Sequence, residues 1–167
     1  MNQKKEILQF LPWIIFSAGL TTFLYSALIA FILNIVIARE DLLNGIVLEI
    51  GGCLFFAAMI LIGLFAHQPN TFSTHPNLWS NGAMAAIMLG SIILNKPFTA
   101  QYTNKGEHRF HMYLSAIWSG LLFISALISL LHAYFGLSNM MSTIGTVVAI
   151  MLGIKANSAY AKWYYQR

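Results

Sequence analysis

The residues from Leu8 to Ala38 form a run of 31 positions without a single charged side chain. A helix needs about 20 apolar residues to cross a hydrocarbon core about 30 Å thick, so this run is long enough to span a bilayer. Further apolar runs follow, and only 8% of the chain is charged, against roughly 25% in soluble domains. That leaves too little polar surface for a water-soluble globule. We therefore predict an all-α, polytopic transmembrane helical bundle.

Charged and turn-forming residues divide this single predicted domain into about five spans. The breaks are the charges that begin at Arg39, the proline-containing residues 68–77, the polar residues 95–111 and a turn at Gly136. The predicted spans are residues 11–38, 45–66, 79–94, 112–135 and 140–161. The first is too long for a perpendicular span and too short for two. We expect one tilted helix there, or an interfacial first turn before Pro12.

The distribution of basic residues predicts the orientation of the chain. Five spans place the two ends on opposite sides of the membrane. The side of the C-terminus then holds Arg39, Lys96, Lys105, Arg109, Lys155, Lys162 and Arg167, and the other side holds Lys4 and Lys5. The positive-inside rule puts the C-terminus in the cytoplasm and the N-terminus outside. Lys4-Lys5 is the longest basic cluster, so we expect the lipid bilayer, and no nucleic acid, as a partner.

The sequence offers no recognisable catalytic centre. It contains no nucleophile elbow, zinc-protease motif, phosphate-binding loop or dinucleotide-binding glycine pattern. Among the carboxylates only Glu49 lies inside a predicted span, so an intramembrane aspartate pair is absent from the sequence. Cys53 is the only cysteine, which excludes an internal disulfide. We predict a protein that is not an enzyme and has no cofactor.

Small residues spaced four apart suggest close helix packing. Such faces are formed by Gly82, Ala86 and Gly90, by Gly145, Ala149 and Gly153, and by Ala18, Thr22, Ser26, Ala30 and Asn34. Small side chains let two helix backbones approach closely inside a membrane. The faces either pack the bundle itself or dock a partner. Because there are more of them than five helices need to bury, we predict an accessory or scaffold subunit that binds other membrane proteins, or a homo-oligomer.

A polar stripe in the fourth span allows a second function. Ser115, Ser119 and Ser129 lie on one face, with His132 beside them. Serines in a membrane either hydrogen-bond neighbouring helices or line a solute path. The alternative prediction is therefore a small oligomeric transporter or channel, with a path lined by the first and fourth spans.

The histidines are candidate ligands for a metal ion or a haem. Glu107, His108 and His111 are spaced to share a helical face, but Arg109 lies among them and a metal site needs further ligands. We do not predict a metal site, and these three residues are its only candidates. His67 and His132 lie near the opposite boundary. If they faced each other they would allow a third function, a haem- or quinone-associated electron-transfer subunit, although interfacial placement explains them as well.

Glu49 and Lys155 are the only charged residues inside the predicted spans. Glu49 begins the second span and Lys155 lies near the end of the fifth, so both fall near the same membrane boundary. An unpaired charge at depth costs about 2.5–3.5 kcal/mol on insertion scales. We predict that the two form an intramembrane pair joining neighbouring spans, with separate snorkelling and an ion-handling site as the alternatives.

The segment after the third span is the most distinctive motif. Lys96, Pro97, Phe98, Thr99, Gln101 and Tyr102 form the pattern K-P-F-T-x-Q-Y. It resembles a loop element of small bacterial inner-membrane proteins with four to five spans, a family without an agreed activity. Trp118 and the basic, aromatic end of the chain extend the resemblance over about the last 80 residues, although Thr103-Asn104-Lys105 departs from its usual Ala-Arg-Glu.

The resemblance implies a multi-pass protein of the bacterial inner (plasma) membrane and supplies no mechanism. From the residues themselves we expect Pro97 to end the third helix, and Phe98 and Tyr102 to lie in the membrane interface. The same loop is a candidate for contact with a partner or a ligand.

Overall fold

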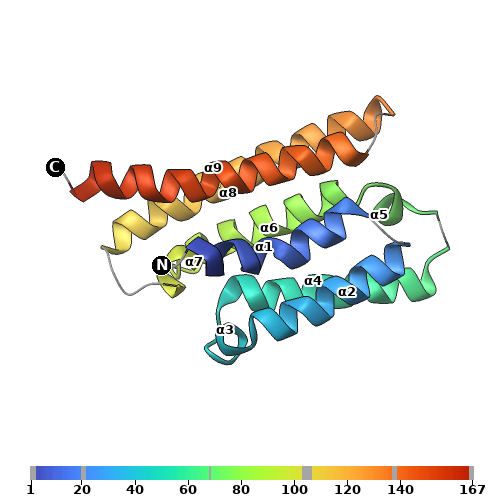
Figure 1. The fold of residues 1–167 in the computed structure, drawn as a ribbon, viewed down its shortest axis with the longest axis horizontal. Coiled ribbons are helices and arrows are strands. Elements are labelled where there is room, and N and C mark those ends of the chain that lie inside the picture. The colour runs from blue at the N-terminus through green and yellow to red at the C-terminus, as the bar shows by residue number, and fades with distance from the viewer. Residues whose placement is uncertain (1–2, 20–21, 68, 103–106, 137–138, 166–167) are drawn as a thin grey trace.

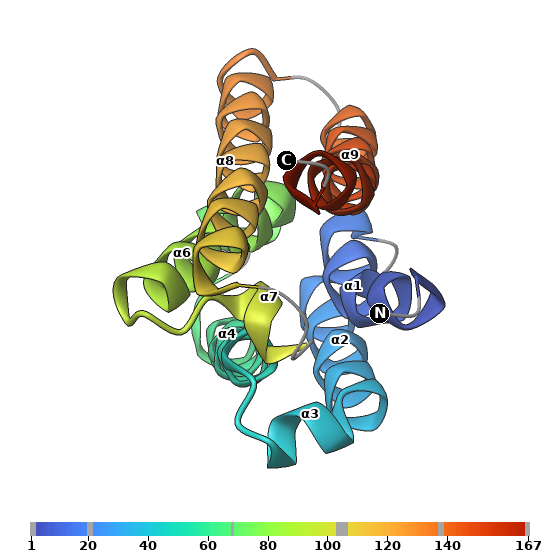
Figure 2. The same cartoon turned by 90° about the vertical axis from the view of Figure 1, so that its left-hand side faces the viewer.

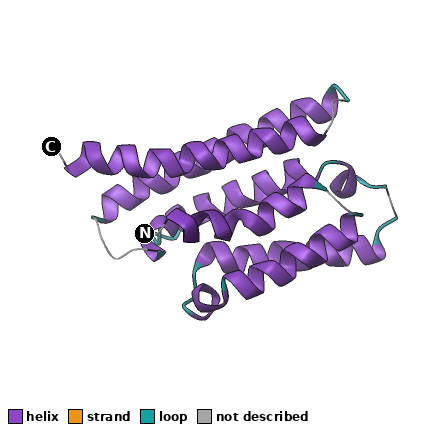
Figure 3. Ribbon diagram, in the orientation of Figure 1, coloured by secondary structure: helices purple, strands orange, loops and turns teal. Residues whose placement is uncertain are grey.

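The computed structural model describes residues 3–19, 22–67, 69–102, 107–136 and 139–165. Every element in that part of the chain is a helix, and it contains no strand (Figure 3). The all-α prediction is therefore confirmed. The helices are α1 (Gln3–Ala18), α2 (Phe23–Ile37), α3 (Arg39–Leu43), α4 (Val47–Phe65), α5 (Thr71–Thr74), α6 (Pro76–Ile93), α7 (Phe98–Gln101), α8 (His108–Tyr134) and α9 (Asn139–Tyr165).

The longer helices run antiparallel along one axis, and the short helices lie at the two ends (Figure 1). Seen along that axis they form two rows, with α8, α6 and α4 in one row and α9, α1 and α2 in the other (Figure 2). The helices α1 and α6 occupy the middle of their rows and contact each other. The core of the bundle therefore lies around these two helices.

The first predicted span is wrong as a single helix. The chain leaves α1 at Ala18 and begins α2 at Phe23, and the two helices pack side by side in opposite directions. Gly19 has a φ of +57°, a left-handed conformation that favours glycine and ends a helix. The predicted small-residue face is split by this turn. Only its members Ser26, Ala30 and Asn34 share a helix, and all three are buried in α2.

The reversal after α1 also corrects the predicted topology. α1 begins and α9 ends at the same end of the bundle, where α3 and α7 also lie (Figure 1). We call this the basic end, because Arg39, Lys96, Arg109 and Lys162 lie there and Lys4 and Lys5 are in the first turn of α1. At the opposite end the connecting residues 19–22, 66–75 and 135–138 contain no lysine or arginine. The start of α1 and the end of α9 thus share one end of the bundle, whereas five spans would place the two termini on opposite sides.

Three helices in the described part of the chain, α4, α8 and α9, are long and apolar enough to cross a membrane. The segments Leu8–Ala18 and Phe23–Ile37 are apolar but shorter. Large apolar side chains such as Leu54, Ile124 and Leu152 are exposed on the outside of the bundle. This outward-facing apolar surface fits a membrane protein.

Small residues bring α9 close to α8. A Cβ atom built on Gly153 would lie 2.7 Å from three atoms of the Trp118 ring, closer than ordinary van der Waals contact. The Trp118 indole stacks on Phe10 with ring centroids 5.0 Å apart and donates to Asn157 Oδ1 at 2.9 Å. Ala149, one turn from Gly153, is also buried. This part of the predicted small-residue face therefore packs the bundle internally.

Candidate binding site

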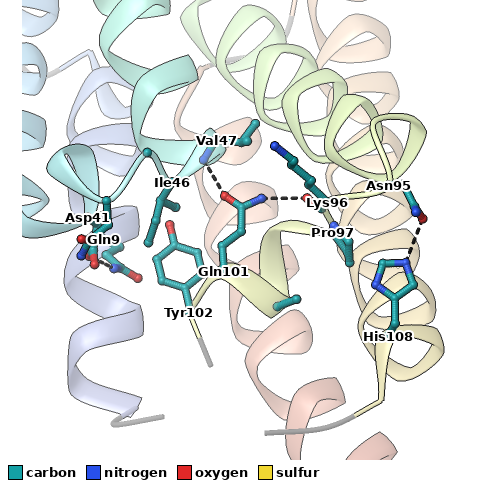
Figure 4. A pocket seen from close by; sticks show the side chains of 13 residues that line it. Gln9, Asp41, Ile46, Val47, Asn95, Lys96, Pro97, Gln101, Tyr102 and His108 are labelled. Carbon is teal, nitrogen blue, oxygen red and sulfur yellow. Dashed lines mark hydrogen bonds between the residues drawn. The ribbon is translucent and has the colours of Figure 1, made fainter. Parts of the chain in front are cut away.

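A polar cavity of about 700 Å³ opens at the basic end of the bundle (Figure 4). Four parts of the chain surround it: α1, α3 with its turn to the start of α4, the segment from Asn95 to Tyr102, and the start of α8. Its lining residues are Gln9, Asp41, Asn44, Gly45, Ile46, Val47, Asn95, Lys96, Pro97, Ala100, Gln101, Tyr102 and His108. The volume lies in the range of about 300–1,000 Å³ typical of small-molecule sites.

The K-P-F-T-x-Q-Y segment folds inward and forms one wall of this cavity. Asn95 has a φ of +58° and ends α6 before Pro97. Phe98 is 4% exposed and packs its ring edge against Trp118, with centroids 6.1 Å apart. Thr99 Oγ1 donates to the His111 carbonyl at 3.1 Å and hydrogen-bonds Ser115 Oγ at 3.0 Å. The segment is therefore buried inside the basic end of the bundle, and we call it the plug. The expected position of Phe98 in the membrane interface is wrong, because its side chain lies inside the bundle.

Gln101 joins this plug to the start of α4. Its Oε1 accepts a hydrogen bond from the Val47 N–H at 2.7 Å, and its Nε2 donates to the Lys96 carbonyl at 2.7 Å (Figure 4). The first N–H groups of a helix have no partner within the helix. Gln101 satisfies one of them from a distant part of the sequence, which fixes α7 against α4.

Tyr102 continues the same connection one residue later. Its hydroxyl donates to Glu49 Oε1 at 2.7 Å, and Glu49 is 1% exposed in the first turn of α4. Burial raises the pKa of the Tyr102 hydroxyl far above its ordinary value, and the neighbouring carboxylates of Glu49 and Asp41 raise it further. Tyr102 therefore stays protonated and keeps donating to Glu49.

Gln9 and Asp41 form the wall on the side of α1. Gln9 Nε2 donates to Asp41 Oδ2 at 2.7 Å, and the two side chains are 5% and 6% exposed. They are brought together by the turn after Gly19, which returns the chain to the basic end. Neither residue is among those predicted from the sequence to form a site. The sequence does carry a signal for these two residues. A polar side chain stands near each end of the uncharged run of residues 8–38, with Gln9 at its start and Asp41 just beyond its end.

A layer of aromatic side chains closes the inner end of the cavity. A void of about 20 Å³ lies beyond Gln9 and Tyr102, and it is lined also by Phe10, Phe98 and Trp118. This void is much smaller than the polar cavity.

Buried uncharged polar groups gather again on the far side of that layer. Asn81 Nδ2 donates to Ser125 Oγ at 3.1 Å and to Thr146 Oγ1 at 2.8 Å, and Ser17 Oγ lies 2.6 Å from Ser80 Oγ. These contacts connect α1, α6, α8 and α9. Asn81 is not among the residues predicted from the sequence, although an asparagine inside an apolar helix indicates buried polar contacts of this kind.

The predicted polar stripe of α8 faces the inside of the bundle. Ser115, Ser119 and Ser129 are at most 7% exposed. Ser115 hydrogen-bonds Thr99, Ser119 donates to the Ala85 carbonyl, and Ser129 pairs with Ser142. His132 is half-buried in the last turn of α8. These serines therefore connect neighbouring elements, which is the packing role allowed by the sequence.

The structure does not bring Glu49 and Lys155 together. Glu49 is buried and bonds to Tyr102, whereas Lys155 is exposed on α9. α9 packs chiefly on α8 and α1, and α4 packs chiefly on α2 and α6. The prediction failed because it treated α1 and α2 as one helix, so it did not foresee that α1 lies beside α9.

The histidine candidates are dispersed. Tyr164 donates to Glu107, His108 Nε2 lies 2.8 Å from Asn95 Oδ1, and His111 Nδ1 lies 3.3 Å from Thr99 Oγ1. Within the described residues these side chains do not form a metal-binding group. His67 follows α4 and His132 ends α8, and α6 lies between those two helices. The structure therefore does not place the two predicted haem ligands face to face.

The outer surface of α4, α6 and α8 carries a second hollow. This apolar groove encloses about 1,000 Å³, and its lining includes the small residues Gly82, Ala86 and Gly120. A Cβ atom built on Gly82 or Gly120 would have nothing within 4 Å. Internal packing therefore does not require glycine at these two positions, in contrast to Gly153.

Comparisons with known proteins add no relative to this description. No family model matches the chain, and neither a curated protein nor a solved structure matches it. The resemblance in the K-P-F-T-x-Q-Y segment accordingly stays a prediction.

Proposed function

We propose that this chain is a multi-pass protein of the bacterial inner membrane whose six longer helices all cross the bilayer, with both termini in the cytoplasm. The support is the charge distribution, because the basic end holds lysines and arginines and the three connections at the opposite end have none. Basic connecting segments stay in the cytoplasm.

Thiol labelling in intact cells tests this orientation. The background is Cys53→Ala, which removes the only cysteine. Glu40→Cys places a thiol on an exposed site at the basic end, and Thr74→Cys does so at the opposite end. A membrane-impermeant maleimide should label the second variant and spare the first until the cells are opened. The reverse pattern, or labelling of both variants, would overturn the proposed orientation.

The function that the geometry supports best is non-catalytic binding of a small polar solute in the cavity at the basic end, as the solute site of a small transporter. The observation that supports solute binding is the cavity itself. It has a polar lining and a volume of about 700 Å³ in a chain with very little charge. The buried polar groups around Asn81 lie farther along α1 and α8, the helices predicted to line a path. The aromatic layer at Phe10 and Trp118 separates the two polar regions.

Thermal unfolding of the purified protein in detergent tests solute binding. Ethanolamine, propionate, glycine and glycerol represent the cationic, anionic, zwitterionic and neutral classes. A ligand present at ten times its Kd stabilises the folded state by about 1.4 kcal/mol, which raises the Tm of a chain this long by about 3–6 °C. We expect a saturable rise with at least one of the four.

Two tryptophan substitutions locate the binding. Ala100 lines the cavity and Ala159 is exposed on α9 outside it. Ala100→Trp should reduce the ligand-dependent rise in Tm, whereas Ala159→Trp should leave it unchanged. If none of the four compounds raises the Tm, or if Ala100→Trp leaves the rise intact, solute binding in this cavity is refuted.

A second function, the accessory subunit suggested by the sequence, is favoured by the groove on α4, α6 and α8. Its proposed occupant is one transmembrane helix of a partner protein. Glycine costs a helix about 0.8–1.0 kcal/mol relative to alanine, and internal packing does not explain Gly82 and Gly120. A floor of small residues is what a second helix needs for close approach.

Site-specific photo-crosslinking in cells tests the groove. A photoreactive residue at Leu89, on the groove wall, should yield one discrete crosslinked product. Gly82→Leu should abolish that product, and Gly90→Leu should not, because Gly90 is on the same helix with equally open surroundings but outside the groove lining. Crosslinks to lipid alone, or equal products in both variants, would refute helix docking.

A further inference from the structure

Asn81 has one polar atom without a partner. Its side chain is 0% exposed in α6, and its Nδ2 donates to Ser125 Oγ at 3.1 Å and to Thr146 Oγ1 at 2.8 Å. Its Oδ1 accepts no hydrogen bond from the described part of the chain. Buried polar atoms in native proteins are almost always hydrogen-bonded, either to protein or to water. An acceptor left open at this depth therefore points to a donor that does not belong to the chain.

The neighbouring hydroxyls determine which end of the amide is open. The Thr146 hydroxyl donates its single proton to the Ser142 carbonyl at 3.1 Å, so its oxygen accepts from Asn81. The reverse orientation of the amide would point its oxygen at the two hydroxyls and leave both buried N–H donors unpaired. Because each unpaired buried group costs free energy, one open acceptor is the better arrangement. The open position of Asn81 is therefore an acceptor.

Ser125 offers the complementary group beside it. Among the described residues its Oγ takes part in one hydrogen bond, as the acceptor from Asn81, so its own O–H proton is still available. The amide oxygen and nitrogen share one carbon, which places Asn81 Oδ1 within about 5.7 Å of Ser125 Oγ. Two successive O–H···O bonds span about 5–6 Å. One hydroxyl group between the two side chains can therefore donate to Asn81 and accept from Ser125.

The surroundings of this pair are uncharged. Asn81 lies about one and a half turns into α6 from the end of the bundle opposite the basic end. The helices α1, α6, α8 and α9 meet there, and they contain no Asp, Glu, Lys or Arg over residues 7–18, 76–93, 110–134 and 139–154. A charged ligand buried inside a membrane without a counter-charge is unfavourable. The expected ligand is therefore neutral.

We propose that Asn81 and Ser125 bind one uncharged hydroxyl group inside the bundle, which donates to Asn81 Oδ1 and accepts from the Ser125 O–H. Water and the hydroxyl of a small neutral solute share this chemistry. The aromatic layer separates this site from the polar cavity. Binding of water here is independent of the proposed function. Binding of a solute hydroxyl rests on that function and names the solute class as a small neutral alcohol.

Cross-relaxation between protons detects the bound hydroxyl group directly. The purified full chain in micelles carries isotope-labelled asparagine, and the side-chain signal of Asn81 is identified by its loss in Asn81→Ala. We expect a cross-peak between the Asn81 amide protons and water, with the sign of rotating-frame cross-relaxation and not that of proton exchange. Absence of a cross-peak to water and to added alcohol would overturn the proposal.

Methanol and methylammonium are a matched pair of probes for the source of the hydroxyl. They have the same number of non-hydrogen atoms, and only methylammonium is charged. If a solute hydroxyl fills the site, the methanol methyl protons give a saturable cross-peak to Asn81 while the water cross-peak declines. If water alone fills it, the water cross-peak is unchanged at every methanol concentration. Both results support a bound hydroxyl, whereas a saturable cross-peak to methylammonium would overturn the neutral class of the ligand.

Ser125→Ala tests the second contact, with Ser119→Ala as its matched control. Both serines are buried on α8, but Ser119 donates to the Ala85 carbonyl and does not bond to Asn81. Loss of one hydrogen bond weakens binding by about two- to tenfold. The Asn81 cross-peak should therefore weaken at least about twofold in Ser125→Ala and stay unchanged in Ser119→Ala. Equal cross-peaks would overturn the role of Ser125. Should Ser125→Ala fail to fold, the probes on the unaltered chain still decide the proposal.

The outcomes separate this inference from the proposed function. A ligand-dependent rise in Tm that Ala100→Trp removes, together with no cross-peak at Asn81, would support solute binding in the cavity and overturn the inference. A water cross-peak at Asn81 without any ligand-dependent rise in Tm would support the inference and refute solute binding in the cavity.

Discussion

Replacing Gly153 with alanine should destabilise the bundle relative to the same replacement at Gly145. Both glycines are in α9, so both replacements gain about 0.8–1.0 kcal/mol of helix propensity, and this gain cancels in the comparison. A Cβ on Gly145 meets nothing within 4 Å, whereas a Cβ on Gly153 lies 2.7 Å from three atoms of Trp118. The difference in stability therefore reports the contact between α9 and the indole.

The structure also sets the size of the effect. The indole must retreat by at least 0.7 Å to move the contact from 2.7 Å to the 3.4 Å of ordinary van der Waals distance. Trp118 is 2% exposed, stacked on Phe10 and hydrogen-bonded to Asn157, so retreat disturbs several neighbours. Overpacking of a well-packed core costs about 1–3 kcal/mol. We expect Gly153→Ala to be less stable than Gly145→Ala by about that amount.

Reversible unfolding in mixed micelles, followed by circular dichroism, measures the difference. Equal stability of the two variants would refute the close approach of α9 to α8. A further pair of variants identifies the clashing group: in a Trp118→Phe background the cost of Gly153→Ala should fall, because the smaller ring leaves room. An unchanged cost there would show that another contact is responsible.

Two further changes test the site and the interior. Tyr102 has a raised pKa in the folded state, so the stability that it contributes is present below about pH 10 and falls as the pH rises above that value. Tyr102→Phe should therefore leave the phenolate absorbance of the folded protein unchanged up to about pH 11; a loss of one tyrosine's amplitude in that range would contradict the raised pKa. Asn81→Ala removes two side-chain hydrogen bonds, each worth about 0.6 kcal/mol on average inside a membrane. It should lower the free energy of unfolding by about 1 kcal/mol in the micelle assay, and an unchanged value would mean that these bonds add no net stability.

The sequence predicted most of the helices because their boundaries carry chemical signals. The charges that begin at Arg39, the prolines at 69 and 76 and the polar residues after Asn95 mark where helices begin or end. The reversal after α1 carries no such signal. Gly19 and Thr22 are compatible with a continuous membrane helix, and hydropathy does not distinguish one long apolar helix from two that fold back on each other. The turn depends on packing between α1 and α2, which is a tertiary property.

The binding site was harder to predict for the same reason. Gln9 and Asp41 are 32 positions apart, and they meet only because the chain reverses between them. Tyr102 was identified from the motif, but the predicted partner of Glu49 was Lys155, and the structure pairs Glu49 with Tyr102 instead. The polar and charged residues of the site can therefore be recognised in the sequence. Which of them contact each other depends on the order of the helices in the two rows, and the sequence does not show that order.

The K-P-F-T-x-Q-Y segment connects the candidate site to the stability of the fold. One run of residues caps α4 through Gln101, holds the buried Glu49 through Tyr102 and packs Phe98 on Trp118. Trp118 in turn contacts Gly153 of α9. This segment therefore touches α4, α8 and, through one indole, α9. Phe98, Tyr102 and Trp118 also line the small void at the inner end of the cavity, so the side chains that hold the bundle together at this end also separate the polar cavity from the polar groups around Asn81.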